Sequence, residues 1–146
     1  MTIRMSSGLR TALMADTGMA AAMQDGYILI YSGPQPESPD KAPTGSLLGH
    51  ITTNGSPPPS LHAGFAGSLR FYADRPGSLI NRGDWVISGL RAGKPGWWRF
   101  VTYDDRGGTS SKAYRIDGSV GESFDVAADM YPYMHLRIMG FTLSFP

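Results

Sequence analysis

The side chains that could perform chemistry are few and scattered. The three histidines, His50, His62 and His135, are far apart, with no paired carboxylate or cysteine at metal-ligand spacing. The chain has no cysteine and no Gly-x-Ser-x-Gly element that would present a nucleophile. We therefore expect no catalytic residue, no metal and no cofactor, and a protein that is not an enzyme. The alternative is a hydrolase, which would require His62, Asp84 or Asp105 to converge with a serine in one cleft.

Several polar motifs resemble binding motifs, but turn chemistry explains them better. Asp104 and Asp105 are adjacent and could bind calcium, which takes six or more oxygen ligands, yet nothing nearby supplies the rest. We expect a solvated turn there, and Asp117-Gly118 is likewise typical of a turn. Arg106-Gly107-Gly108 lacks the following helix of a phosphate-binding loop.

Length and charge narrow the possibilities further. The 146 residues fit a single domain over 1–146, with an N-terminal arm and helix over 1–25 and a β-sandwich over 26–146. A net charge of +1 favours neither nucleic acid nor a membrane as the partner. No signal peptide or run of 18 apolar residues is present, so we expect synthesis and use in the cytoplasm, or assembly there into something larger. The low charged content of 17% suits a surface that is buried against other chains.

The N-terminal segment has a helical composition from Gly8 to Gln24. Ser6 and Ser7 are candidate N-caps, and Leu9 and Leu13 lie on one apolar face. Gly26 is expected to end the helix in the left-handed conformation, and residues 16–17 could cap a second short helix. The helix could pack on a sheet edge or dock on a neighbouring subunit.

The rest of the chain consists of short strand signals separated by turns. Strands are expected at 27–31, 46–53, 68–73, 78–81, 85–90, 97–103, 112–117, 123–127 and 134–145. This spacing predicts an all-β fold, an antiparallel β-sandwich or jelly roll with one N-terminal helix and Pro-rich loops. In the last strand the apolar positions change parity at Gly140, which predicts a bulge or sharp bend at Met139-Gly140.

The segment from 33 to 45 contains four prolines, Pro34, Pro36, Pro39 and Pro43. Proline lacks the backbone N–H, so this segment cannot complete a regular hydrogen-bond ladder. Its backbone groups are left for solvent or another chain. We therefore interpret it as a candidate contact arm, an interpretation that requires the segment not to be ordered by its own domain alone.

Aromatic residues suggest a contact surface. Trp97 and Trp98 are adjacent, so on a strand they face opposite sides, and we expect one in the core and one facing out. The alternative is that both pack on the sheet, with one covered by a loop. An outward tryptophan could anchor a protein interface or stack on a sugar ring. Tyr131 and Tyr133 flank Pro132 and could form an aromatic rim for either purpose.

Motifs along most of the chain resemble those of small virion proteins of tailed bacteriophages. In the N-terminal half they are Gly8-Leu9-Arg10-Thr11-Ala12-Leu13, Gly26 followed by Tyr31-Ser32-Gly33, Pro34-Gln35-Pro36, Asp40 to Gly45, and Leu47-Leu48. In the C-terminal half they are Gly96-Trp97-Trp98-Arg99-Phe100, Ile116-Asp117-Gly118-Ser119-Val120-Gly121, and Phe141-Thr142-Leu143.

The resemblance implies a non-enzymatic structural part of the virion. The role expected from it is a capsid cement (decoration) protein that sits on the major capsid shell, contacts the major capsid protein and forms a homo-dimer or other homo-oligomer. The host cytoplasm would be the site of assembly. Alternatives are a tail or neck protein, and a carbohydrate-binding sandwich that uses Trp98 or Tyr133. The candidate interface residues are Leu9, Leu13, Pro34, Gln35, Pro36, Pro39, Pro43, Trp98, Tyr131 and Tyr133.

Overall fold

The computed structural model describes residues 3–15, 18–126 and 129–144. Its elements are β1 (Arg4–Met5), α1 (Ser7–Met14), α2 (Met19–Ala22), β2 (Gly26–Ser32), β3 (Leu47–Thr53), β4 (Arg70–Arg75), β5 (Ser78–Arg82), β6 (Trp85–Gly89), β7 (Pro95–Thr102), β8 (Ile116–Ser119), β9 (His135–Arg137) and β10 (Thr142–Ser144). The prediction of an all-β sandwich is confirmed. No helix among the described residues has the length and apolar character needed to cross a membrane.

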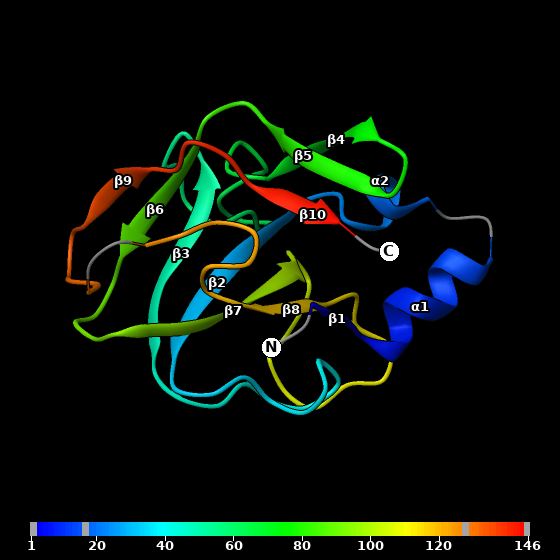
Figure 1. Ribbon diagram of the computed structural model, residues 1–146, viewed down its shortest axis with the longest axis horizontal. Coiled ribbons are helices and arrows are strands. Elements are labelled where there is room, and N and C mark those ends of the chain that lie inside the picture. The colour runs from blue at the N-terminus through cyan, green and yellow to red at the C-terminus, as the bar shows by residue number, and fades with distance from the viewer. Residues whose placement is uncertain (1–2, 16–17, 127–128, 145–146) are drawn as a thin grey trace.

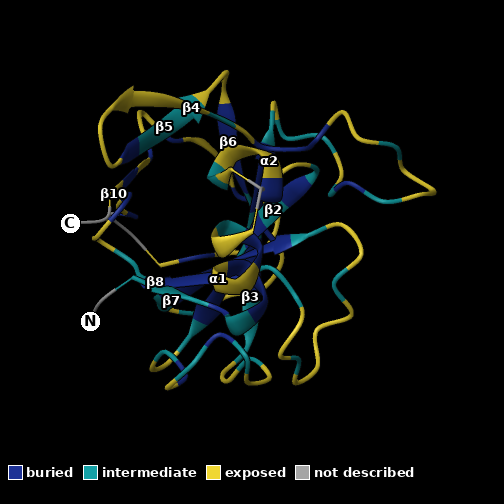
Figure 2. Cartoon of the chain, turned by 90° about the vertical axis from the view of Figure 1, so that its right-hand side faces the viewer, coloured by how far each residue is buried: buried dark blue, intermediate teal, exposed yellow. Residues whose placement is uncertain are grey.

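Two antiparallel sheets form the layers (Figure 1). The large sheet has seven strands in the order β1-β8-β7-β2-β3-β6-β9, and the small sheet has three in the order β10-β5-β4. Between them lies an aromatic cluster in which Phe141 is about 5 to 6 Å from the rings of Trp85, Trp98 and Phe124. Figure 2 shows the division: β8 is largely buried, whereas β4 is exposed along most of its length.

The predicted single helix is two short helices. The Ser6 side chain caps α1 by accepting a hydrogen bond from the Leu9 amide at 3.2 Å, as the sequence predicts. The prediction for Gly26 is wrong. Asp25 has the positive φ of 55°, and Gly26 is the first residue of β2. A Cβ at Gly26 would collide with the Phe100 ring, so glycine is needed there for close packing. The possible cap at residues 16–17 lies outside the described residues.

The C-terminal strand predictions need correction. No strand forms over 123–126, the described part of the segment predicted at 123–127. The segment 134–145 is divided: β9 belongs to the large sheet and β10 to the small one, so the chain changes layer around Met139-Gly140. The predicted break is thus confirmed. Met134 and Ile138 are buried as expected, but Leu136, at the edge of the large sheet, is 41% exposed.

Candidate functional site

One face of the large sheet packs against the small sheet, and the other face is turned away from it. The face that is turned away carries a buried ion pair. Alternation along β7 places Trp98 in the core between the sheets and Arg99 on this second face. Asp117 lies directly opposite Arg99 on β8. The Arg99 guanidinium donates to both carboxylate oxygens, at 2.7 and 2.9 Å, and its Nη1 donates to the carbonyl of Lys41 at 2.8 Å. Both side chains are at most 1% exposed, so this charge pair is fully internal.

A second pair lies beside the first. Arg115 donates from Nε and Nη2 to the two carboxylate oxygens of Asp105, each at 2.7 Å. Nη2 also donates to the Gly108 carbonyl at 2.7 Å, and Nη1 donates to the carbonyls of Pro39 at 3.1 Å and Lys41 at 3.5 Å. The side chains of both partners are 1% exposed. Arg115, the residue before β8, therefore ties the loop around Asp105 and Gly108 to the proline segment.

Environment shifts the two carboxyl pKa values in opposite directions. Burial acts to raise the pKa of Asp105, but hydrogen bonds from Arg115 and Gly107 and the nearby arginine charges outweigh it, so the pKa is below its ordinary value. For Asp117, burial is the stronger effect and raises the pKa despite the hydrogen bonds from Arg99. Neither group is an exposed base, and both serve as acceptors for arginine. The expectations of a solvated turn at Asp105 and a turn at Asp117 are wrong.

The proline segment is fastened along its length to its own domain. Its Asp40 carboxylate accepts hydrogen bonds from the Ser7 amide at 2.7 Å and from the Ser7 hydroxyl. Arg4 donates to the Glu37 carbonyl at 2.7 Å, and the Trp97 indole donates to the Thr44 carbonyl at 3.3 Å. The condition set for a contact arm is therefore not met. The phage-cement interpretation loses the structural support that this segment would have given it.

The individual prolines agree with this result. Pro36 and Pro39 are buried, Pro43 is half-buried and Pro34 is exposed. Gln35 is half-buried and its side-chain oxygen accepts a long hydrogen bond of 3.4 Å from the Ser119 hydroxyl.

The other candidate interface residues divide into buried and exposed sets. Leu9 is 0% and Trp98 1% exposed, so both belong to the core and cannot meet a partner. Leu13 is partly buried and packs against the same core. Tyr131 and Tyr133, in contrast, are 55% and 95% exposed.

The prediction that one of the adjacent tryptophans faces out is wrong, and the alternative is confirmed. Trp97 stacks on Tyr31 at a ring distance of 4.7 Å and is covered by the proline segment. It is 0% exposed, and its neighbour in the core, Trp98, is 1% exposed. Sequence alternation assigns the two faces correctly but cannot tell that a loop covers the second one.

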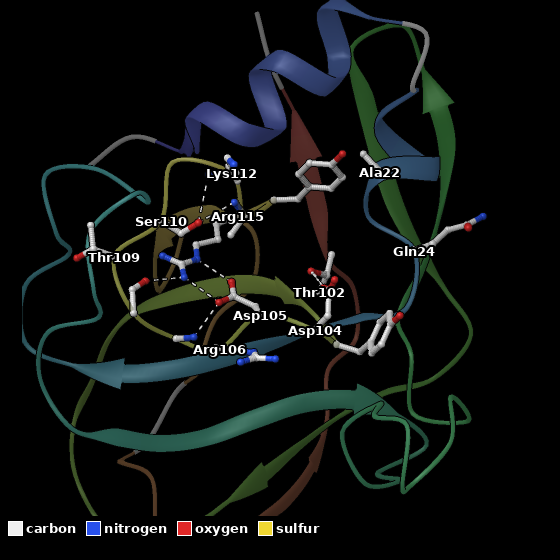
Figure 3. A pocket seen from close by; sticks show the side chains of 15 residues that line it. Ala22, Gln24, Thr102, Asp104, Asp105, Arg106, Thr109, Ser110, Lys112 and Arg115 are labelled. Carbon is white, nitrogen blue, oxygen red and sulfur yellow. Dashed lines mark hydrogen bonds and ion pairs between the residues drawn. The ribbon is translucent and has the colours of Figure 1, made fainter.

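A polar hollow of about 680 Å³ opens beside the second ion pair (Figure 3). It is lined by Ala22, Gln24 and residues 102–110 and 112–115. Asp105 and Ser110 both line it, whereas His62 and Asp84 do not, and both oxygens of the Asp105 carboxylate accept hydrogen bonds from Arg115. Within the described residues, no three histidine, aspartate or glutamate side chains gather as a metal site would require. His50 is half-buried on β3, where burial lowers its pKa.

Sequence reasoning missed all four charged residues of the ion pairs as a functional set. The sequence did contain one signal: two predicted strands each hold a charged residue, and the two charges have opposite sign. These residues are Arg99, in the most apolar strand, and Asp117, after Ile116. Recognising the pair requires knowledge that β7 and β8 are neighbours in this register.

Comparison of the chain with protein-family models, curated proteins and solved structures gave no match.

Proposed function

We propose that this protein is a non-enzymatic structural protein of a tailed-bacteriophage virion, acting as a capsid cement protein on the major capsid shell. The motif resemblance supports this role. In this role its partners are the major capsid protein and further copies of itself.

One observation carries the choice of contact surface. Tyr133 has a φ of 64°, in the left-handed region that bulky residues avoid, yet its side chain is 95% exposed. Its amide donates to the Gly89 carbonyl at 3.0 Å, and the Met134 amide donates to Tyr131 at 3.2 Å, which fixes the turn. The ring itself is almost entirely outside the packed interior. A strained backbone that presents a large exposed ring is typical of a residue retained for a contact.

The surroundings of this tyrosine extend the surface. Tyr131, Leu136 and Met139 are 55%, 41% and 93% exposed. β9 is the last strand of the large sheet, so no described strand pairs with its outer edge. We name the set Tyr131, Tyr133, Leu136 and Met139 the β9 patch. Tyrosine and methionine are enriched in protein interfaces, and an open strand edge can add backbone hydrogen bonds.

The physics of a repeated shell fits such a patch. Each contact is small, but many copies bound across a symmetric lattice combine through multivalency. A protein that binds only the assembled state stabilises it by mass action. The role requires no catalytic group.

The test is thermal melting of purified shells that lack this protein, with and without it added. We expect the native protein to raise the melting temperature of the shell. Tyr133→Asn should reduce binding to the shell, because the ring is lost, while the isolated protein stays as stable or becomes more stable, since asparagine tolerates the left-handed conformation. Tyr72→Ala, a 46% exposed tyrosine on β4, is the matched control and should behave like the native protein.

Equal shell melting temperatures with the protein confirmed bound would contradict a cement role. Location in the intact particle then separates the alternatives: density at the tail or neck would favour a tail or neck protein. A sugar-stacking platform at Trp98 is excluded by its burial at 1% exposure.

A further inference from the structure

The polar hollow has the dimensions of a ligand site. Its volume of about 680 Å³ falls within the roughly 300–1,000 Å³ of small-molecule sites. Its lining comes from a single long loop with additions from Ala22 and Gln24 at the end of the helical segment. Because Arg115 and Asp105 hold that loop from inside, the hollow is preorganised in the free protein.

Charged side chains line the hollow, but its cations do not form a site for an anion. All five N–H groups of the Arg115 guanidinium have acceptors, namely both oxygens of Asp105 and the carbonyls of Pro39, Lys41 and Gly108. This arginine therefore has no donor left for an anion. The other cations in the lining, Arg106 and Lys112, lie on opposite sides of the Arg115–Asp105 pair (Figure 3) and do not converge. The site thus favours a neutral ligand.

The rim offers hydrogen-bonding groups of both kinds. The exposed Asp104 accepts from the Thr102 hydroxyl at 2.7 Å through Oδ1, which orients the carboxylate and leaves Oδ2 open. Among the described residues, the Gln24 amide and the Thr109 and Tyr114 hydroxyls have no hydrogen-bond partner within the chain. A ligand whose own groups both donate and accept, as hydroxyls do, would satisfy this mixture.

Two tyrosine rings complete the lining. Tyr103 is 37% exposed, and its ring is held edge-on against Phe65 at 5.1 Å, which fixes the orientation of its face. Tyr114 is half-buried. Aromatic rings give flat apolar faces at little entropic cost. A pyranose ring has the matching character, with an apolar C–H face and a periphery of hydroxyls.

We propose that the polar hollow binds a neutral saccharide, with Asp104 accepting from its hydroxyls and Tyr103 packing on its C–H face. The site lies away from the β9 patch in sequence and shares no residue with it. Glycan binding here is therefore independent of the proposed cement role, and either can fail without the other.

The experiment applies the labelled full-length protein to an array of neutral glucose-, galactose-, mannose- and N-acetylglucosamine-containing oligosaccharides together with sulfated and phosphorylated glycans, followed by calorimetry on the strongest ligand. We expect binding to at least one neutral glycan. Asp104→Ala and Tyr103→Ala should each weaken it about tenfold or more, as expected for a lost charge-assisted hydrogen bond or a lost stacking face. Tyr72→Ala should leave it unchanged.

Thermal melting of each variant verifies the fold, and the exposed position of Asp104 makes that substitution compatible with folding. Three results would overturn the proposal. They are the absence of binding to every neutral glycan, retention of affinity within about twofold in both variants, and binding restricted to sulfated or phosphorylated glycans that Lys112→Ala abolishes.

Discussion

On β7, Trp98 and Phe100 enter the aromatic core beneath the small sheet, whereas Trp97 and Arg99 lie on the opposite face beneath loops. A sheet can close the first face with apolar side chains alone, because its backbone groups are already paired in strands. A loop that closes a face carries unpaired carbonyls with it, and these must find donors. Arg99 and Arg115 supply those donors. In this protein, the face covered by loops contains buried charge, whereas the face covered by the small sheet is closed by apolar side chains.

The largest loss of stability is expected from a substitution on the loop-covered face. Asp117→Ala leaves the Arg99 guanidinium buried beside a single carbonyl. We expect the free energy of unfolding to fall by about 3–5 kcal/mol, because an uncompensated charge remains in the interior. Urea denaturation measures the change, and faster hydrogen exchange across 33–45 would localise it.

The matched control for that change removes both charges. The double variant Arg99→Met with Asp117→Leu should lose less stability than the single variant, since no unpaired charge is left. A cost below about 1 kcal/mol for Asp117→Ala would mean that the pair behaves like a surface ion pair, and the contrast between the two faces would be lost.

A substitution at the next residue along β8, Gly118, tests the packing of the face that is covered by the small sheet. Gly118 lies against the Trp98 indole, and a Cβ there would collide with the ring. We expect Gly118→Ala to lower the free energy of unfolding by about 1–3 kcal/mol through overpacking. Gly108→Ala is the control, because a Cβ at that position meets no atom, and its effect should stay within about 0.5 kcal/mol. Equal effects of the two substitutions in urea denaturation would contradict the close packing.

The smallest expected effect concerns the stability of the protein at acidic pH. The pKa of Asp105 is lowered in the folded protein, so the unfolded chain binds its proton first as the pH falls. The stability that Asp105 contributes is thus present above its ordinary pKa of about 3.9 and is lost as the pH drops toward the folded value. Asp117, whose pKa is raised, acts in the opposite direction.

We therefore expect Asp105→Asn to reduce the loss of stability between roughly pH 5 and pH 2, with Asp40 and other carboxylates accounting for the remainder. Urea denaturation of the native protein and the variant across that range gives the two slopes. An unchanged slope would show that the Arg115 pair does not depend on the charge of Asp105.

The sequence predicts much of the sandwich because its signals are local. Alternation and turn residues locate β2, β3, β6 and β7 to within a few residues, and Ser6 is a correct N-cap. The change of parity at Gly140 predicts the passage between sheets. The failures concern groups whose role depends on distant segments: Asp105 and Asp117 have a turn-like context, but their partners are 10 and 18 residues away in the chain.

The candidate site shows the same difference between features set by neighbouring residues and features set by distant ones. The sequence by itself determined the all-β class, the irregular proline segment and the assignment of Trp97 and Trp98 to opposite faces, because backbone conformation and alternation are properties of neighbouring residues. Only the tertiary structure decided that a loop covers the second face, that Arg99 and Arg115 hold it there, and that the exposed aromatic surface is at Tyr133. Burial and ion pairing depend on which distant segments come into contact in the folded chain, and local sequence patterns do not reveal those contacts.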